Sequence, residues 1–195
     1  MTELGHGSNV MGLETTATYD PETDEIVVHT PSESARKEWI GNAALHAKMA
    51  TVFAQLVVNG ETHGVHAILV RIRDDEGNPT EGVRLGDCGY KLGLNGVDNG
   101  RIWFDKVRVP RDNLLDRYGS ITDEGEYSSP IPSQSRRFFT MLGTLVAGRV
   151  CVASGSVSAS KVGLAIALRY GASRRQFGEP GKPEMRLWQY PAHRL

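Results

Sequence analysis

Residues 136–174 contain no proline and are rich in alanine, leucine and valine. This composition predicts one long helix of roughly 35–38 residues, about three times the mean length of helices in globular proteins. Small residues recur along it and would let a second helix approach closely: Gly143, Ala147, Gly148, Ala153, Gly155, Ala159 and Gly163. A lone helix cannot bury its own apolar stripe, so we expect partner helices from sequence outside these 195 residues or from another chain.

Residues 12–109 show a different sequence pattern, in which short segments rich in β-branched residues are separated by turns. The spacing favours an antiparallel barrel or sandwich over βαβ units, which argues against a dinucleotide-binding Rossmann unit. The predicted fold class is therefore α+β, with an antiparallel β-barrel or sandwich followed by the start of an all-α helical bundle. The expected domains are residues 1–118, a linker at 119–135 and an incomplete helical domain at 136–195. The expected strands are residues 14–19, 25–30, 49–58, 66–73, 82–85 and 100–110, and a further helix is expected to start at Glu184.

Composition excludes several classes of function. A net charge of −1 gives no electrostatic basis for binding nucleic acid or an anionic membrane. We find no apolar run of the roughly 18 residues that a membrane span needs and no leader-like segment at residue 1. Cys88 and Cys151 fit neither a disulfide framework nor a metal motif, and the six histidines show no metal spacing. No Ser/His/Asp arrangement is evident.

The first nine residues, Met-Thr-Glu-Leu-Gly-His-Gly-Ser-Asn, form a small, polar, glycine-rich segment. Such a loop can press its main chain against a planar polar ligand. The run from Thr2 through Asn9 resembles the flavin-contacting signature of the acyl-CoA dehydrogenase/oxidase superfamily, and its Gly-His-Gly form is similar to the oxidase branch. This match begins at residue 1, where a folded domain would not normally start, so we expect the chain to be an internal fragment of a larger enzyme.

A second segment, Lys37-Glu38-Trp39-Ile40-Gly41-Asn42, resembles the flavin-stacking strand of the same superfamily. That resemblance implies that Trp39 covers the flavin ring and that Thr2 and Gly41 touch FAD, with Ser8 nearby. A lone tryptophan is more often a core residue, and that alternative stays open. Many dehydrogenases of the superfamily carry threonine where Gly41 stands, and a glycine would leave a gap that admits dioxygen.

A third segment, residues 91–100 followed by residues 104–115, is a glycine-rich loop that leads into a strand. Its place in the chain and its amino-acid sequence resemble the end of the superfamily's middle β domain in acyl-CoA oxidases. We assign it no catalytic role.

A fourth segment, Arg174-Arg175-Gln176-Phe177-Gly178, closes the long helix. A basic helix end followed by glycine is also what the helix dipole favours without any ligand. The resemblance implies that Arg174, Gln176 and Phe177 contact the FAD of a dimer partner, the guanidinium suiting a pyrophosphate. Arg149 matches a pocket-facing arginine and is assigned to the acyl-CoA neighbourhood, although a surface salt bridge explains it equally well.

Taken together, the resemblance identifies the chain as a member of the acyl-CoA oxidase family. It implies FAD-dependent oxidation of acyl-CoA to trans-2-enoyl-CoA, with dioxygen giving hydrogen peroxide, in a homodimer that shares its FAD sites. It also implies that the catalytic glutamate lies outside residues 1–195, so no catalytic residue is assigned in this chain and the chain alone is expected to be inactive. The expected location is the cytoplasm in a bacterium and the peroxisome in a eukaryote.

Three alternatives remain. The chain could derive from an acyl-CoA dehydrogenase that passes electrons to a carrier flavoprotein. It could be a non-enzymatic gene-fragment remnant, or a β-barrel interaction module.

Overall fold

The computed structural model describes residues 1–194 and divides into two compact units, Met1–Met141 and Leu142–Leu195. The domain boundaries expected above stay a prediction.

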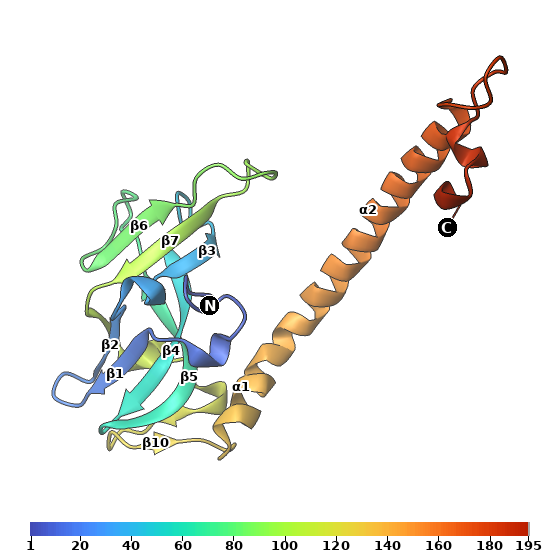
Figure 1. Ribbon diagram of the computed structural model, residues 1–195. Helices are drawn as coiled ribbons and strands as arrows, with labels where there is room; N and C mark the ends of the chain where they lie inside the picture. The colour runs from blue at the N-terminus through green and yellow to red at the C-terminus, as the bar shows by residue number, and fades with distance from the viewer. Residues whose placement is uncertain (195) are drawn as a thin grey trace. The chain divides into compact units, whose positions relative to one another are not determined.

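The first unit is built on two sheets (Figure 1). The five-stranded sheet has the order β5-β4-β1-β2-β8, and the three-stranded sheet has the order β3-β7-β6. The strands of the larger sheet are β1 Thr16–Asp20, β2 Glu25–His29, β4 Met49–Val58, β5 Glu61–Arg71 and β8 Val107–Pro110. Those of the smaller sheet are β3 Lys37–Gly41, β6 Val83–Asp87 and β7 Asn99–Phe104, and a separate ribbon pairs β9 Ser120–Ile121 with β10 Tyr127–Ser128. Short 3₁₀ turns lie at Val10–Gly12, Glu33–Ala35, Arg111–Asn113 and Asp116–Tyr118.

The two sheets share one apolar core. Strand β4 alternates regularly between buried and partly exposed side chains from Val52 onward, as a strand with one core-facing side should. The buried cluster draws on both sheets, with Ile26 and Leu56 from the larger one and Ile102 and Phe104 from the smaller one. Two layers that enclose one core form a sandwich, which confirms the predicted β domain.

Two details of the β prediction were wrong. The sheet is mixed, because β1 pairs with β4 in parallel while its other neighbour, β2, is antiparallel. The strand expected over residues 100–110 is two strands, β7 and β8, in different sheets. Lys106 between them adopts a φ of 51°, and the Asp105 amide donates to the Gly82 carbonyl, so the chain turns there from one layer to the other.

The long helix predicted over residues 136–174 is interrupted, which corrects that expectation. Helix α1 spans Gln134–Leu142, a 3₁₀ turn spans Gly143–Leu145, and α2 spans Val146–Ser173. Glycine is a poor helix former, and ψ at Leu142 is −15°, shallower than an α-helix requires. Helix α1 packs with the first unit, where Phe138 and Arg137 are buried.

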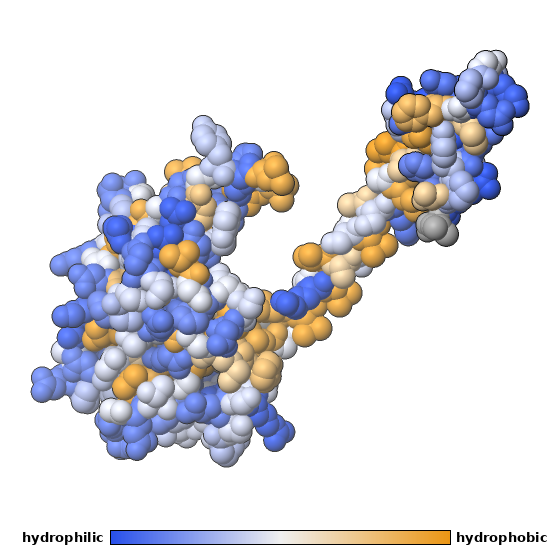
Figure 2. Space-filling view, viewed as in Figure 1, coloured by the Kyte–Doolittle hydropathy of each residue, from blue (hydrophilic) through white to orange (hydrophobic). Residues whose placement is uncertain are grey.

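Helix α2, 28 residues long, has no buried residue, and Figure 2 shows its apolar side chains along the surface. By length and composition α2 alone in the described residues is apolar enough to cross a membrane. This corrects the expectation that no segment is apolar over that length. The helix holds three charged residues, Arg149, Lys161 and Arg169, and an 18-residue window within it contains no more than two of them. A core helix of a water-soluble bundle passes the same test.

Beyond α2 the helix expected from Glu184 is absent, and two 3₁₀ turns occupy its place, Leu187–Gln189 and Pro191–His193. Pro191 disfavours the α conformation at Tyr190, which is extended instead.

We predict that Gly100→Ala destabilises the first unit. A Cβ at this buried strand position would lie 2.4 Å from the Ala44 amide nitrogen and 2.6 Å from the Ala43 carbonyl carbon. These are backbone atoms, so no rotamer change relieves the overlap, and we expect a loss of about 1–3 kcal/mol or more. Denaturant unfolding measures it against Gly86→Ala, whose methyl would meet only side-chain atoms, the Trp103 ring at 3.4 Å and the Arg101 Cβ at 3.8 Å. Equal stability of the two variants would contradict the prediction.

Candidate functional site

The loop of residues 1–9 lies against the start of β3. The Leu4 amide donates to the Arg36 carbonyl at 3.0 Å, and the Glu38 amide donates to the Thr2 carbonyl at 3.1 Å. The Thr2 hydroxyl donates to the Glu38 carbonyl at 2.8 Å. Because its hydrogen is used in this way, Thr2 Oγ1 can act toward a ligand only as an acceptor. Ser8 lies farther along the loop and is exposed.

The middle residue of strand β3, Trp39, is exposed on the surface of the unit. Trp39 is 55% exposed and adopts a φ of 62°, rare for a residue with a large side chain. The register of β3 on β7 shifts between Lys37 and Ile40, so a bulge lies at Trp39. An added Cβ at Gly41 would meet nothing within 4 Å. The structure thus brings Thr2 against β3 and leaves Trp39 and Gly41 open on the strand, which fits residues that meet a planar ring; that they do so stays a prediction.

The turn after Gly41 is held by two side chains that sequence analysis missed. Asp98 accepts from the amides of Ala44, Leu45 and His46, at 2.9, 3.0 and 3.2 Å. Arg73, which is buried, donates to the carbonyls of Ala43, Ala44 and Ala47. An anion at the amide end and a cation at the carbonyl end of this turn complement its peptide dipoles. The aspartate belongs to the glycine-rich third segment, to which we had assigned no role.

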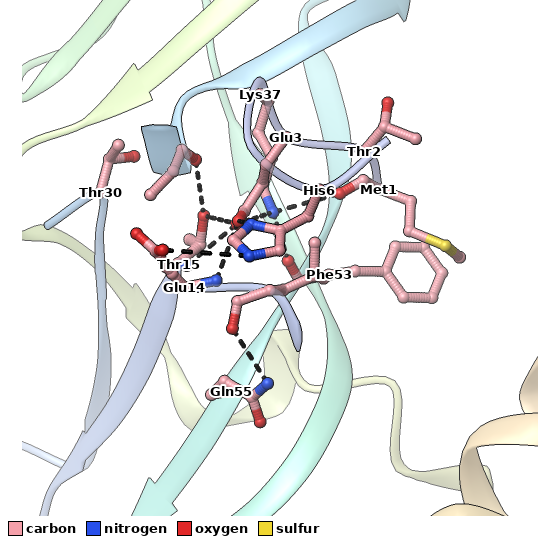
Figure 3. Close-up of polar contacts among 12 residues, drawn as sticks. Met1, Thr2, Glu3, His6, Glu14, Thr15, Thr30, Lys37, Phe53 and Gln55 are labelled. Atoms are coloured by element: carbon pink, nitrogen blue, oxygen red, sulfur yellow. Dashed lines mark hydrogen bonds and ion pairs between the residues drawn. The ribbon is translucent and has the colours of Figure 1, made fainter. Parts of the chain in front are cut away.

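A second missed feature is the buried ion pair between Glu3 and Lys37 (Figure 3). Each side chain is at most 2% exposed, and Lys37 Nζ lies 2.9 Å from Glu3 Oε1. Burial lowers the pKa of Lys37, while the charge of Glu3 opposes that shift. Fully buried acidic and basic residues are rare unless paired. Both residues lie in the first and second segments of the Sequence analysis, but nothing in either segment alone indicates that Glu3 and Lys37 pair with each other.

In the second unit, residues 174–177 run back alongside residues 184–187. The Gln176 amide donates to the Met185 carbonyl at 2.9 Å, and the Met185 amide donates to the Phe177 carbonyl at 2.7 Å. Arg174 lies just past the end of α2, and Phe177 is 73% exposed with a φ of 56°. Arg149 is exposed on α2. These residues and the β3 edge belong to different units.

Two family models match the sequence. Residues 1–107 match "Acyl-CoA dehydrogenase, middle domain", and residues 142–195 match "Acyl-CoA oxidase, C-alpha1 domain". Together with relatives of about 50% identity along the whole chain, these matches decide the family. The chain belongs to the acyl-CoA oxidase family.

The relatives of this oxidase-family chain agree in sequence and fold. Acyl-coenzyme A oxidase 3 (peroxisomal) from Arabidopsis thaliana is 52% identical over 99% of the chain and 29% of that relative. Acyl-CoA oxidase 1 from Yarrowia lipolytica superposes with a TM-score of 0.85 at 43% identity, over 99% of this chain and 28% of that one. Acyl-CoA oxidase-2 from Caenorhabditis elegans, solved with FAD, ascaroside-CoA and ATP, gives a TM-score of 0.79 at 36% identity over 97% and 28%. The chain therefore spans about 29% of the length of the first of these.

Three carboxylates of the motifs in the first unit, those of Glu3, Glu38 and Asp98, accept hydrogen bonds within the protein. Burial alone would raise the pKa of Glu3 and of Glu38, but hydrogen bonds, from Thr15 and the Glu14 amide for the former and from two arginines for the latter, outweigh it and lower both pKa values. The pKa of Asp98 is lowered in the same way by its amide and His46 donors, against the effect of burial. Within residues 1–194 no group of three or more His, Cys, Asp or Glu side chains could hold a metal ion.

Proposed function

We propose that these residues form the flavin-facing part of an acyl-CoA oxidase, which converts acyl-CoA and dioxygen to trans-2-enoyl-CoA and hydrogen peroxide. The observation that carries the proposal is the open edge of β3, where Trp39 is exposed and Gly41 borders empty space. Bound FAD would supply the acceptor for the β-hydrogen of the substrate. A relative solved with FAD and an acyl-CoA-type ligand, ascaroside-CoA, supports this assignment.

In this proposal the chain's own residues bind and orient. Thr2 accepts a hydrogen bond from the flavin or approaches it with its backbone, Trp39 covers the ring, and Gly41 admits close contact or dioxygen. Ser8 lines the same loop. None of the chain's residues is assigned as the base that removes the α-proton.

The residues of the second unit are proposed to act on a second copy of the chain. Arg174, Gln176 and Phe177 would contact the FAD of the dimer partner, with the guanidinium of Arg174 against the pyrophosphate. Arg149 is proposed to face the acyl-CoA. The apolar, uncovered surface of α2 supports a helical neighbour, since an isolated helix of this composition would leave it in water. The Arabidopsis relative is named peroxisomal, and we propose the same compartment if the source is eukaryotic and the cytoplasm if it is bacterial.

Replacing Gly41 by leucine tests the flavin edge. Because the site is open and Gly41 has no positive φ, we expect folding stability to stay within about 0.5 kcal/mol of the wild type. If the ring packs there, the new side chain overlaps it, and the Kd for FAD should rise about 10–100-fold, equivalent to 1–3 kcal/mol of overpacking. Titration of FAD into the purified chain, followed by flavin fluorescence, measures the change.

Gly93→Leu is the matched control, because an added Cβ at Gly93 also meets nothing within 4 Å and the position has no proposed flavin contact. We expect its FAD affinity to stay at the wild-type value. Wild-type affinity in Gly41→Leu would show that the flavin does not meet this edge. Absence of FAD binding by the wild type would favour the gene-fragment remnant or the interaction module. The dehydrogenase alternative is tested by whether the reduced, flavin-loaded protein reoxidises at once in air.

A further inference from the structure

The buried pair Glu3–Lys37 joins the two segments that carry the proposed flavin contacts. Glu3 follows Thr2 in the loop, and Lys37 is the first residue of β3, two positions before Trp39. Their backbones form an isolated antiparallel bridge, and their side chains meet beneath it (Figure 3). No other ion pair in residues 1–194 links this loop to β3.

Both charged groups use their hydrogen-bonding capacity inside the protein. Glu3 Oε1 accepts from Lys37 and, at 2.9 and 2.6 Å, from the amide and hydroxyl of Thr15. Glu3 Oε2 lies 2.9 Å from the Glu14 amide and 3.0 Å from His6 Nδ1.

Lys37 Nζ has three hydrogens and three acceptors. Besides Glu3, these are the carbonyls of Phe53 at 2.7 Å and Met1 at 3.3 Å. The ammonium therefore has no donor left for a phosphate, a substrate or a proton transfer. Lys37 can therefore affect a ligand only through the segments that it holds together, which are the loop of residues 1–9, β3 and β4.

What these bonds hold in place is a strained piece of backbone. A positive φ at a residue such as Trp39 is strained and persists only where the surroundings fix it. On one side of Trp39 the chain is fixed by Lys37 and by the Thr2 hydroxyl on the Glu38 carbonyl. On the other side it is fixed by the pairing of Ile40 and Gly41 with β7.

We propose that the Glu3–Lys37 pair is a positioning pair: it holds Trp39 in its outward, positive-φ conformation with Thr2 beside it, and so sets how this edge meets the flavin. This inference rests on the proposed function. A buried ion pair is weak evidence for stability, because apolar replacement of both partners at similar volume is often neutral, whereas its geometric specificity can fix one register among several. The proposal therefore predicts a change in the position of this edge beyond what general destabilisation of the unit produces.

Lys37→Met in the 195-residue chain is the test. Methionine fills a similar volume. The buried Glu3 carboxylate loses its cation, which lowers the stability of the fold, but it keeps its four other donors, so a folded protein is expected. Amide hydrogen exchange, followed by NMR, should accelerate at least tenfold at Leu4 and Glu38, whose amides bridge the loop and β3. The Kd for FAD should rise about tenfold, and the visible absorption and circular dichroism of the bound flavin should shift.

Arg137→Met is the matched control. Arg137 is a buried cation of the same unit that donates to the carbonyls of His63 and Ile131, remote in sequence from both motifs. We expect it to lose comparable stability, while FAD affinity and the flavin spectrum remain within twofold of the wild type. If Lys37→Met does not fold, Glu3→Gln, which keeps the shape and removes the charge, should give the same changes at smaller size.

The outcomes separate the two proposals. Wild-type FAD binding together with an unchanged Kd, spectrum and exchange in Lys37→Met would overturn the positioning role. Equal loss of FAD in Lys37→Met and Arg137→Met would overturn it as well, because the effect would then be general destabilisation. A wild-type chain that takes up no FAD would instead overturn the proposed function, and the inference with it.

Discussion

Acidification from pH 7 to pH 4 is expected to remove about 3 kcal/mol of folding stability through His66 alone. Burial lowers the pKa of His66 from 6.5 to about 4, and the positive charges of Arg137 and His63 add to the shift. The Gly64 carbonyl can only accept, so His66 Nδ1 carries the hydrogen and Nε2 accepts from the Tyr127 hydroxyl, both at 3.0 Å. A second proton, on Nε2, would require the Tyr127 hydroxyl to change from donor to acceptor.

The direction follows from which state binds the proton. Between pH 6.5 and pH 4 the unfolded chain protonates this histidine and the folded chain does not, so stability is complete above about 6.5 and falls as the pH approaches 4. His63 has a lowered pKa as well, chiefly through burial, and acts in the same direction. The lowered pKa of Glu3 acts differently: its contribution is present above the unfolded value and is lost as the pH falls below about 4.

Urea unfolding at several pH values measures the effect, and the comparison with His66→Gln isolates it. Glutamine can donate and accept but does not titrate, so this variant should lose about 3 kcal/mol less than the wild type between pH 7 and pH 4. His63→Gln should change the pH dependence by a smaller amount, since His63 is less buried than His66. Parallel curves for the wild type and His66→Gln would show that His66 is not the titrating group.

The sequence predicted the larger elements because their signals are local. The strands expected at residues 14–19 and 25–30 are present, with slightly different bounds, as the antiparallel pair β1 and β2. The proline-free stretch correctly predicted helical structure. Its break at Gly143–Leu145 was not predicted, because the overall composition of the stretch does not show where a single glycine weakens the α-helix. The parallel pairing of β1 with β4 joins residues about 40 positions apart, and no local pattern encodes it.

The motifs predicted the residues of the candidate site, but they did not predict the side chains that hold these residues in place. Thr2, Trp39 and Gly41 lie in segments whose amino-acid sequence resembles that of a family, so they could be singled out without knowing which residues they contact in the fold. Asp98 and Arg73 hold the turn after Gly41 from distances of roughly 30 to 50 residues along the chain, and neither has a spacing signal. Buried polar side chains of this kind are recognised only when their partners are known.

The final prediction concerns chemistry that this chain should lack. Given FAD and a medium-chain acyl-CoA, residues 1–195 are expected to bleach the flavin at least 10²–10⁴-fold more slowly than an enzyme with a positioned general base, since that is the usual worth of such a group. The α-proton of a thioester is far too weakly acidic to leave at neutral pH without a base and a polarised carbonyl. An anaerobic stopped-flow assay at the flavin absorption band measures the rate, with the Arabidopsis acyl-coenzyme A oxidase 3 as the positive control.

The structural reason lies in the acidic side chains of the motifs. Glu3 accepts five hydrogen bonds, Glu38 is paired with Arg36 and Arg101, and Asp98 accepts from three amides. All three have lowered pKa values and already accept hydrogen bonds from the protein, which makes each a poor acceptor for a substrate proton. The assay is made on samples whose FAD content has been measured, so that slow bleaching reports on proton removal and not on missing cofactor. Rapid bleaching would place a base within these 195 residues, and Glu38→Gln, as the carboxylate nearest to Trp39 in sequence, would be the first variant to identify it.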